Sequence, residues 1–226
     1  NLVRHFADPD VGVVCGALQF VRTPESQHTE GAYWVYESML RLMEARLGAT
    51  LTASGATSDV VVAATKTVTS GGGNIAINAP QDITLTGTGT VITGGTGTIT
   101  LTADSDNATS GAINAANSTT AIQAGTGLVT LLARSGIAAG TTITNVTATN
   151  SASGTIAISD TAGGLNVSTG GVSQAGNGTV DITATGGTLN VNDSVTSTGT
   201  GTITLTATGA TSDVVVATTK TVTSGG

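Results

Sequence analysis

One short pattern recurs six times in this chain and limits what it can fold into. A glycine is followed by alternating polar and aliphatic residues and then by alanine or another small residue, beginning at Gly73, Gly97, Gly127, Gly154, Gly178 and Gly201. Consecutive copies lie 23 to 30 residues apart. Recurrence at this spacing predicts a solenoid, in which each repeat stacks on the one before it.

The alternation within each copy has a period of two, which is the pattern of a β-strand with one buried face. The pairs expected to point inward are Ile75/Ile77, Ile99/Leu101, Val129/Leu131, Ile156/Ile158, Val180/Ile182 and Ile203/Leu205. If the copies stack in sequence order, Ile156/Ile158 should lie between Val129/Leu131 and Val180/Ile182.

Two weaker strands are expected between successive copies, for example those that begin near Asp82 and Thr90. About three short strands per repeat favour an all-β fold, a right-handed parallel β-helix of about six to seven coils. A sandwich or barrel would also use many short strands, but its core normally recruits aromatic side chains. All five aromatic residues precede Glu37, so the β-helix is the preferred interpretation.

The chain also repeats a long string almost unchanged. Residues 50–72 read TLTASGATSDVVVAATKTVTSGG, and residues 204–226 read TLTATGATSDVVVATTKTVTSGG, 154 positions later. In a β-helix these strings are expected to be equivalent coils, about six turns apart. The second string would leave strand edges unpaired, which predicts self-association through exposed terminal coils.

Composition changes sharply near Gly48, which predicts two parts, residues 1–48 and residues 49–226. Both His, both Met and the single Cys15 precede this point, and only three cationic residues follow it, namely Lys66, Arg134 and Lys220. A net charge of −7 and isolated cations argue against a nucleic-acid partner. No apolar run approaches the ~18 residues of a membrane span. A lone cysteine excludes a site built from several cysteines.

The run GNIAINAPQDITLTGTGTVITGGTGTITLTA, residues 73–103, and the looser copies after it resemble the filamentous haemagglutinin-type repeats of large bacterial surface adhesins. The resemblance covers about residues 49–226. It implies a β-helical segment at the bacterial cell surface or outside the cell, with a non-enzymatic role as a stalk or interaction scaffold. A host-surface molecule or a polysaccharide is the ligand class that it implies.

Residues 1–48 predict a short strand that ends near Val21 and an amphipathic helix from Glu30 to Leu47. The apolar stripe of this helix is formed by Tyr33, Tyr36, Leu40, Met43 and Leu47. Solenoid ends need a cover against edge pairing, so we expect the helix to act as an N-terminal cap.

The string HFADPDVGVVCGALQF, with EGAYWVYESMLRLMEARLGAT after it, is similar to a fragment of processive family 2 glycosyltransferases. The metal-binding Asp-x-Asp, the catalytic base and the Gln-x-x-Arg-Trp motif of that family are not among these residues. Asp8 and Asp10 fall in the turn before the strand, so no functional residue carries over. The alternatives to a stalk are therefore an inactive transferase remnant fused to a repeat tail, and a β-helix carbohydrate-active protein.

Two groups of acidic residues after Gly48 are candidate sites. Asp59 and Asp82 precede strands of successive repeats and could face each other as a pair of acids or a cation site, although solvated turn residues are the preferred interpretation. The run DSDNATSG, from Asp104 to Gly111, resembles the start of a calcium loop but lacks the bidentate glutamate. We expect a bulging loop there.

The remaining candidates are polar ladders and sequons. Asn-x-Ser/Thr sequons begin at Asn107, Asn117, Asn145, Asn166, Asn177 and Asn192, as expected by chance in a chain rich in Asn and Thr. Ice binding would need an unbroken threonine ladder, whereas the outward positions of the main strands read Ala76, Thr100, Thr130, Ala157, Asp181 and Thr204. We therefore expect no catalytic, cofactor-binding or metal-binding residues and no enzymatic activity.

Overall fold

The computed structural model describes residues 48–108 and 110–225. These residues form β-strands and no α-helix. The strands are β1 (Gly48–Thr52), β2 (Val60–Val62), β3 (Thr67–Ser70), β4 (Asn74–Ala79), β5 (Ile83–Leu85), β6 (Thr90–Thr93), β7 (Ile99–Ala103), β8 (Ile113–Ala115), β9 (Ile122–Ala124), β10 (Leu128–Ala133), β11 (Ile137–Thr142), β12 (Asn145–Asn150), β13 (Ile156–Asp160), β14 (Leu165–Gln174), β15 (Val180–Thr185), β16 (Leu189–Val191), β17 (Val195–Ser197), β18 (Ile203–Thr208), β19 (Val214–Val216) and β20 (Val222–Ser224).

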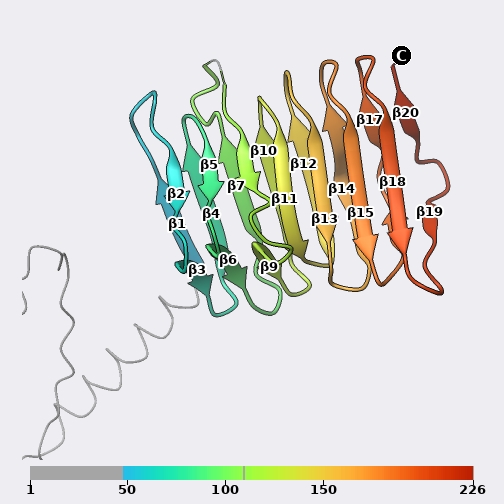
Figure 1. Ribbon diagram of the computed structural model, residues 1–226, viewed down its shortest axis with the longest axis horizontal. Coiled ribbons are helices and arrows are strands. Elements are labelled where there is room, and N and C mark those ends of the chain that lie inside the picture. The colour runs from blue at the N-terminus through green and yellow to red at the C-terminus, as the bar shows by residue number, and fades with distance from the viewer. Residues whose placement is uncertain (1–47, 109, 226) are drawn as a thin grey trace, which may run out of the picture. The chain divides into compact units, whose positions relative to one another are not determined.

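The strands make two parallel sheets of ten strands each. Sheet A runs β1-β4-β7-β10-β12-β14-β16-β19, with β17 and β20 continuing it beside β14. Sheet B runs β18-β15-β13-β11-β8-β5-β2, with β3, β6 and β9 joined to it through β11. Figure 1 shows the rungs following one another in sequence order from blue to red. The described residues are therefore all-β and form a solenoid like a parallel β-helix, as the repeat predicts.

The core lies between the two sheets and is made of aliphatic side chains. The pairs Ile75/Ile77, Ile99/Leu101, Val129/Leu131, Ile156/Ile158 and Val180/Ile182 are at most 2% exposed, which confirms the predicted inward face. Ile203 and Leu205 of β18 are half-buried. Because successive residues of a strand point to opposite faces, the residue between the two members of each pair points outward.

The main strands, which come from the six copies of the repeat, do not form one continuous ladder. The rungs follow one another in sequence order, but the prediction that each main strand stacks on the main strand before it is wrong. The copies that begin at Gly73, Gly97 and Gly127 give β4, β7 and β10 of sheet A, whereas those that begin at Gly154, Gly178 and Gly201 give β13, β15 and β18 of sheet B. Ile156 and Ile158 consequently pack between β15 and β11, where they pair with Ile137 and Ala139 instead of Val129 and Leu131.

A shortened coil in the middle of the chain causes this exchange of faces. Val129 pairs with Val146 and Ile137 pairs with Ile156, so strands that stack on each other there are separated by only 17 and 19 residues in the sequence. Strand β11 alone continues both β8 and β9. Before this point, sheet B receives two strands from each coil. After β14, which pairs with both β16 and β17, the two strands belong to sheet A.

The long repeated string consequently lies on opposite faces in its two occurrences. Strand β1 is in sheet A and β2 and β3 are in sheet B, whereas β18 is in sheet B and β19 and β20 are in sheet A. The prediction that whole turns separate the two strings is therefore wrong, because the separation includes a half turn. Each string still has the same local form, one strand in one sheet followed by two in the other. The repeated sequence specifies the form of a rung but not the face on which it lies.

Close packing at the corner before the main strands explains the glycine that begins the repeat. A Cβ on Gly178 would overlap the carbonyl oxygen of Gly154 on the preceding rung, and a Cβ on Gly201 would overlap that of Gly178. Gly127 lies in the same way against Gly97 in sheet A. Only glycine allows the backbones of successive rungs to approach this closely.

Several predictions lie outside the described residues. They are the strand that ends near Val21, the capping helix from Glu30 to Leu47, the environment of Cys15, and the segment similar to a glycosyltransferase with Asp8 and Asp10. In the part of the chain that the structure describes, no helix is long and apolar enough to cross a membrane.

Candidate functional site

Asp59 and Asp82 stand one rung apart, as the repeat predicts, but their carboxylates are engaged by the backbone. The Oδ1 atom of Asp59 accepts a hydrogen bond from the N–H of Asp82 at 3.0 Å. The Oδ1 atom of Asp82 in turn accepts one from the N–H of Ala112 at 2.8 Å. Each carboxylate therefore ties its own turn to the next rung. Asp59 is exposed and Asp82 is half-buried, so both lie in turns at the surface, as the preferred interpretation states, but they also bond to the backbone of a neighbouring rung.

The loop that begins at Asp104 lies against a cationic side chain, that of Arg134. The buried Asp104 carboxylate accepts a hydrogen bond from the N–H of Ala108 at 3.0 Å and lies 3.7 Å from the guanidinium of Arg134. The same guanidinium donates to Oδ1 of Asn107 at 3.4 Å. In sequence Arg134 is remote from this loop and looks isolated; the stacking of β10 next to β7 brings them together.

Asp160 is a buried carboxylate that sequence reasoning missed. It stands at the end of β13, where all five other copies of the repeat have alanine, and it is 0% exposed. Its Oδ1 atom accepts hydrogen bonds from the Thr141 hydroxyl and the Ile143 N–H, both at 2.9 Å, and Oδ2 accepts one from the Ala162 N–H at 2.9 Å. The carboxylate thus holds the turn between β11 and β12 in the shortened coil.

Burial raises the pKa of the Asp160 carboxyl above its ordinary value, and the hydrogen bonds from Ile143, Ala162 and Thr141 act in the opposite direction. In the pH window between the ordinary value of 3.8 and the raised value, the folded chain holds a proton that the unfolded chain has lost. The free energy of unfolding therefore decreases as pH rises through this window.

We expect Asp160→Asn to remove this contribution, because the amide does not titrate. Urea unfolding at a series of pH values above 3.8 should show a smaller fall in stability for the variant than for the unmodified chain, and the exposed Asp213→Asn variant should follow the unmodified chain. Parallel profiles for Asp160→Asn and the unmodified chain would show that the raised pKa is wrong.

Amide side chains also connect the rungs, inside and outside the core. Inside, Nδ2 of Asn150 donates to Oε1 of Gln174 at 2.9 Å, and both residues are fully buried. On the outer face of sheet A, Nδ2 of Asn166 donates to Oδ1 of Asn145 at 3.1 Å, and Nδ2 of Asn190 donates to Oδ1 of Asn166 at 3.0 Å. Two of the predicted sequons, at Asn145 and Asn166, thus begin with residues of this asparagine ladder.

Asp193 and Lys220 form the closest ion pair among the described residues, with Nζ of Lys220 2.8 Å from Oδ1 of Asp193. The hydrogen bond from Lys220, with those from the backbone of Gly170 and Ser194, lowers the pKa of Asp193 to about 2. The carboxylate joins three successive rungs, since Oδ2 accepts the N–H of Gly170 at 2.9 Å. The pair is a further tie between coils.

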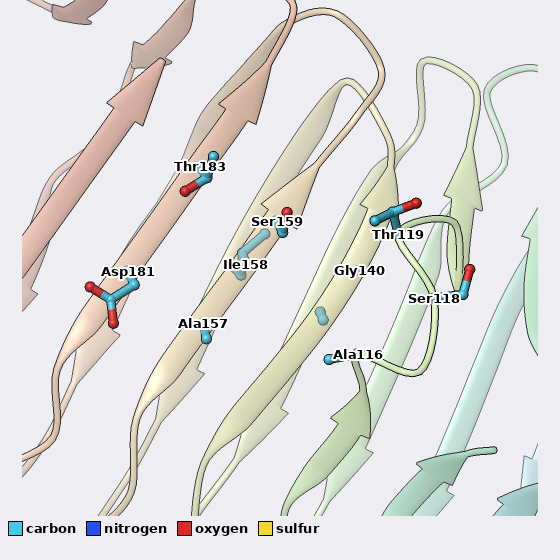
Figure 2. Close-up of a pocket in the computed structure, with 10 residues that line it drawn as sticks. Ala116, Ser118, Thr119, Gly140, Ala157, Ile158, Ser159, Asp181 and Thr183 are labelled. Carbon is cyan, nitrogen blue, oxygen red and sulfur yellow. The ribbon is translucent and has the colours of Figure 1, made fainter. Parts of the chain in front are cut away.

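A shallow groove of about 230 Å³ lies on the outer face of sheet B. Figure 2 shows it over β11, β13 and β15, beside the connection between β8 and β9. That connection rests directly on β11, because a Cβ on Gly140 would overlap the carbonyl oxygen of Ser118. The lining residues are Ala116, Ser118, Thr119, Ala139, Gly140, Ala157, Ile158, Ser159, Asp181 and Thr183.

Small and polar side chains line the groove. The hydroxyls of Ser159 and Thr183 and the carboxylate of Asp181 stand around the small side chain of Ala157 (Figure 2). Oδ2 of Asp181 accepts a hydrogen bond from the Thr179 hydroxyl at 3.1 Å. These groups can hydrogen-bond to a hydroxylated ligand. Among the described lining residues, the carboxylate is that of Asp181.

The outward positions of the main strands divide between the two sheets. Ala76, Thr100 and Thr130 align in sheet A, whereas Ala157, Asp181 and Thr204 align in sheet B. They form two rows instead of one, for the same reason that the main strands exchange faces. Ala76 in sheet A, and Ala157 and Asp181 in sheet B, interrupt the threonines, so neither row is the unbroken threonine ladder that ice binding needs.

No family model, curated protein or solved structure matches this chain. Among residues 48–108 and 110–225, no three or more His, Cys, Asp or Glu side chains are grouped so as to hold a metal ion.

Proposed function

We propose that residues 49–226 form a right-handed parallel β-helix of about six to seven coils that serves as a stalk or interaction scaffold of a bacterial cell-surface or secreted adhesin-like protein. The observation that carries this proposal is the continuous bonding between successive rungs. Parallel backbone ladders run through both sheets, and side chains add ties at the turns, in the core and on the outer face.

These ties suit a structural element that must stay straight and resist opening. Asp59, Asp82 and Asp193 bond to the backbone of a neighbouring rung, and Asn145, Asn166 and Asn190 bond to one another. In a solenoid each rung is stabilised mainly by its neighbours, so added bonds between neighbours strengthen the entire stack.

The surface location is tested in cells that express the full chain. We expect antibodies raised against the repeat to label intact cells, and external protease to remove the label. Label that appears only after the cells are permeabilised would overturn the surface location.

The transferase alternative is tested by calorimetric titration of the full chain with UDP-sugars in the presence of Mn²⁺ or Mg²⁺. A stalk is expected to give no saturable heat. Saturable binding would favour the nucleotide-sugar alternative and count against the proposal.

The groove on sheet B supports a second candidate, a carbohydrate-binding β-helix protein. Its test is the binding of immobilised polysaccharides by the full chain and by two variants, Asp181→Asn in the groove and Asp213→Asn outside it. This candidate requires that only Asp181→Asn weakens binding, by about tenfold for one hydrogen bond to a charged group. Equal binding by all three chains would remove the groove from consideration.

A further inference from the structure

Among the described residues, a further rung covers the repeated string in its first occurrence, and no further rung pairs with it in its second. Val62 of β2 is 5% exposed, whereas the matching Val216 of β19 is 44% exposed. Val214 and Val222 are 41% and 40% exposed, whereas the matching Val60 and Val68 are half-buried. Val215 and its counterpart Val61 are exposed in both occurrences. Figure 1 shows these strands at the red end of the stack. We call the edge of β18, β19 and β20 with which no described strand pairs the terminal edge.

The structure shows what covers the same sequence in its first occurrence. Strands β4, β5 and β6 pair in parallel with β1, β2 and β3, and the paired core positions are Leu51 with Ile77, Val62 with Leu85, and Val68 with Val91. Side chains complete the match. Asp59 accepts the N–H of Asp82 at 3.0 Å, and the hydroxyls of Thr67 and Thr90 lie 3.0 Å apart.

We propose that the terminal edge is a docking surface for a second copy of the 154-residue unit that begins at Gly73. The first rung of that unit, residues 73–93, would pair with β18, β19 and β20 as it pairs with β1, β2 and β3 here. In this register Ile77 of the second unit faces Leu205, Leu85 faces Val216, and Val91 faces Val222. Asp213 then accepts the N–H of Asp82, as Asp59 does.

The differences between the two strings are compatible with this docking. They are Ser54 against Thr208 and Ala64 against Thr218. Ala64 lies next to Gly87 of the covering rung, and a Cβ on Gly87 would come within 2.7 Å of the Ala64 Cβ. Because Gly87 has no side chain, the larger Thr218 can occupy the equivalent place.

The half turn between the strings has a consequence for successive units. Strand β1 lies in sheet A and β18 in sheet B, so the β4 strand of a docked unit would extend sheet B of the unit before it. Sheet A of one unit then continues as sheet B of the next. The groove around Asp181 would consequently face opposite sides of the stack in consecutive units. This docking of one unit on another does not require the chain to be an adhesin.

The test extends the full chain after Gly226 with a copy of residues 73–96 and measures amide hydrogen exchange. We expect exchange at residues 214–216 and 222–224 to slow at least about tenfold relative to the unextended chain, because these strands gain a paired neighbour. The control carries the same appended residues in scrambled order. Protection no greater than in this control would overturn the proposal.

A second measurement fixes the register, in a Cys15→Ser background. Val61 and Thr84 are paired neighbours, so Val215→Cys should form a disulfide with a cysteine at the appended copy of Thr84, since paired strand positions lie within disulfide reach. The matched control places the cysteine at the appended copy of Ile92, which pairs in the third strand of the rung. Equal disulfide formation in both extended chains would overturn the proposed register.

Discussion

Ile158→Asp is expected to cost about 5 kcal/mol or more, enough to unfold the central rungs, because it combines two penalties. Ile158 is 2% exposed and pairs with Ala139 and Ile182 in the neighbouring strands. Losing an aliphatic side chain from a packed core costs about 2–5 kcal/mol. The new carboxylate would also be buried, and the backbone N–H groups around it are already engaged in the parallel ladders of β11, β13 and β15.

Asp160 shows what a buried carboxylate requires at this level of the core. It lies two residues farther along the same strand and is fully buried. It accepts hydrogen bonds from Thr141 at the end of β11, from Ile143 in the turn after β11, and from Ala162 in its own turn. Ile158 is in the middle of β13, where no turn supplies free donors. Positions 158 and 160 are equally buried, but only position 160 has hydrogen-bond donors available for a carboxylate.

The matched control for Ile158→Asp is Thr155→Asp, which adds the same charge at an exposed position just before β13. Thermal and urea unfolding followed by circular dichroism should leave this control within about 0.5 kcal/mol of the unmodified chain. If both variants shift the midpoint equally, the assignment of inward and outward faces is incorrect.

The strands and their buried faces could be predicted from the sequence because they depend on local patterns. Alternation at Ile75/Ile77 or Val180/Ile182 fixes which side chains face the core, since a shift by one residue would expose them. The composition after Gly48 likewise predicted a thin core of aliphatic side chains, and the described core consists of such residues together with a few satisfied polar ones.

The exchange of sheets could not be predicted from the same patterns. It depends on the coil in which β11 replaces two strands, and the copy at Gly127 is followed by the copy at Gly154 after 27 residues, an interval like the others. This ordinary spacing therefore gives no sign that a coil and a half, instead of one coil, separates β10 from β13. Alternation is the same for a strand in either sheet, so it carries no information about which sheet a strand joins.

The polar ties between rungs were also beyond sequence reasoning, for a related reason. Asn145, Asn166 and Asn190 are separated by 21 and 24 residues, and only the correct register places them in line. Asp104 and Arg134 meet across β7 and β10 in the same way. The one local signal was Asp160, an acidic residue at the position where all five other copies of the repeat have alanine.

Gly178→Ala should destabilise the chain by about 3 kcal/mol or more, although it adds a single methyl group. The added Cβ would overlap the carbonyl oxygen of Gly154 on the preceding rung. Relief requires the two rungs to separate at this corner, beside the hydrogen bond from Ile156 N–H to the Thr179 oxygen at 2.9 Å. The Cβ would also lie 3.2 Å from Nε2 of Gln174, which belongs to the buried amide pair.

Gly71→Ala is the matched control, because a Cβ there would have no atom within 4 Å. Neither Gly71 nor Gly178 has a positive φ, so neither variant forces alanine into a strained backbone conformation. Both substitutions reduce the freedom of the unfolded chain equally, which alone would stabilise by about 0.4–1 kcal/mol. The difference between the two urea midpoints therefore isolates the close approach of the rungs at Gly178. Equal midpoints would mean that successive rungs do not pack on glycine at this corner, and the glycine that begins each repeat would need another explanation.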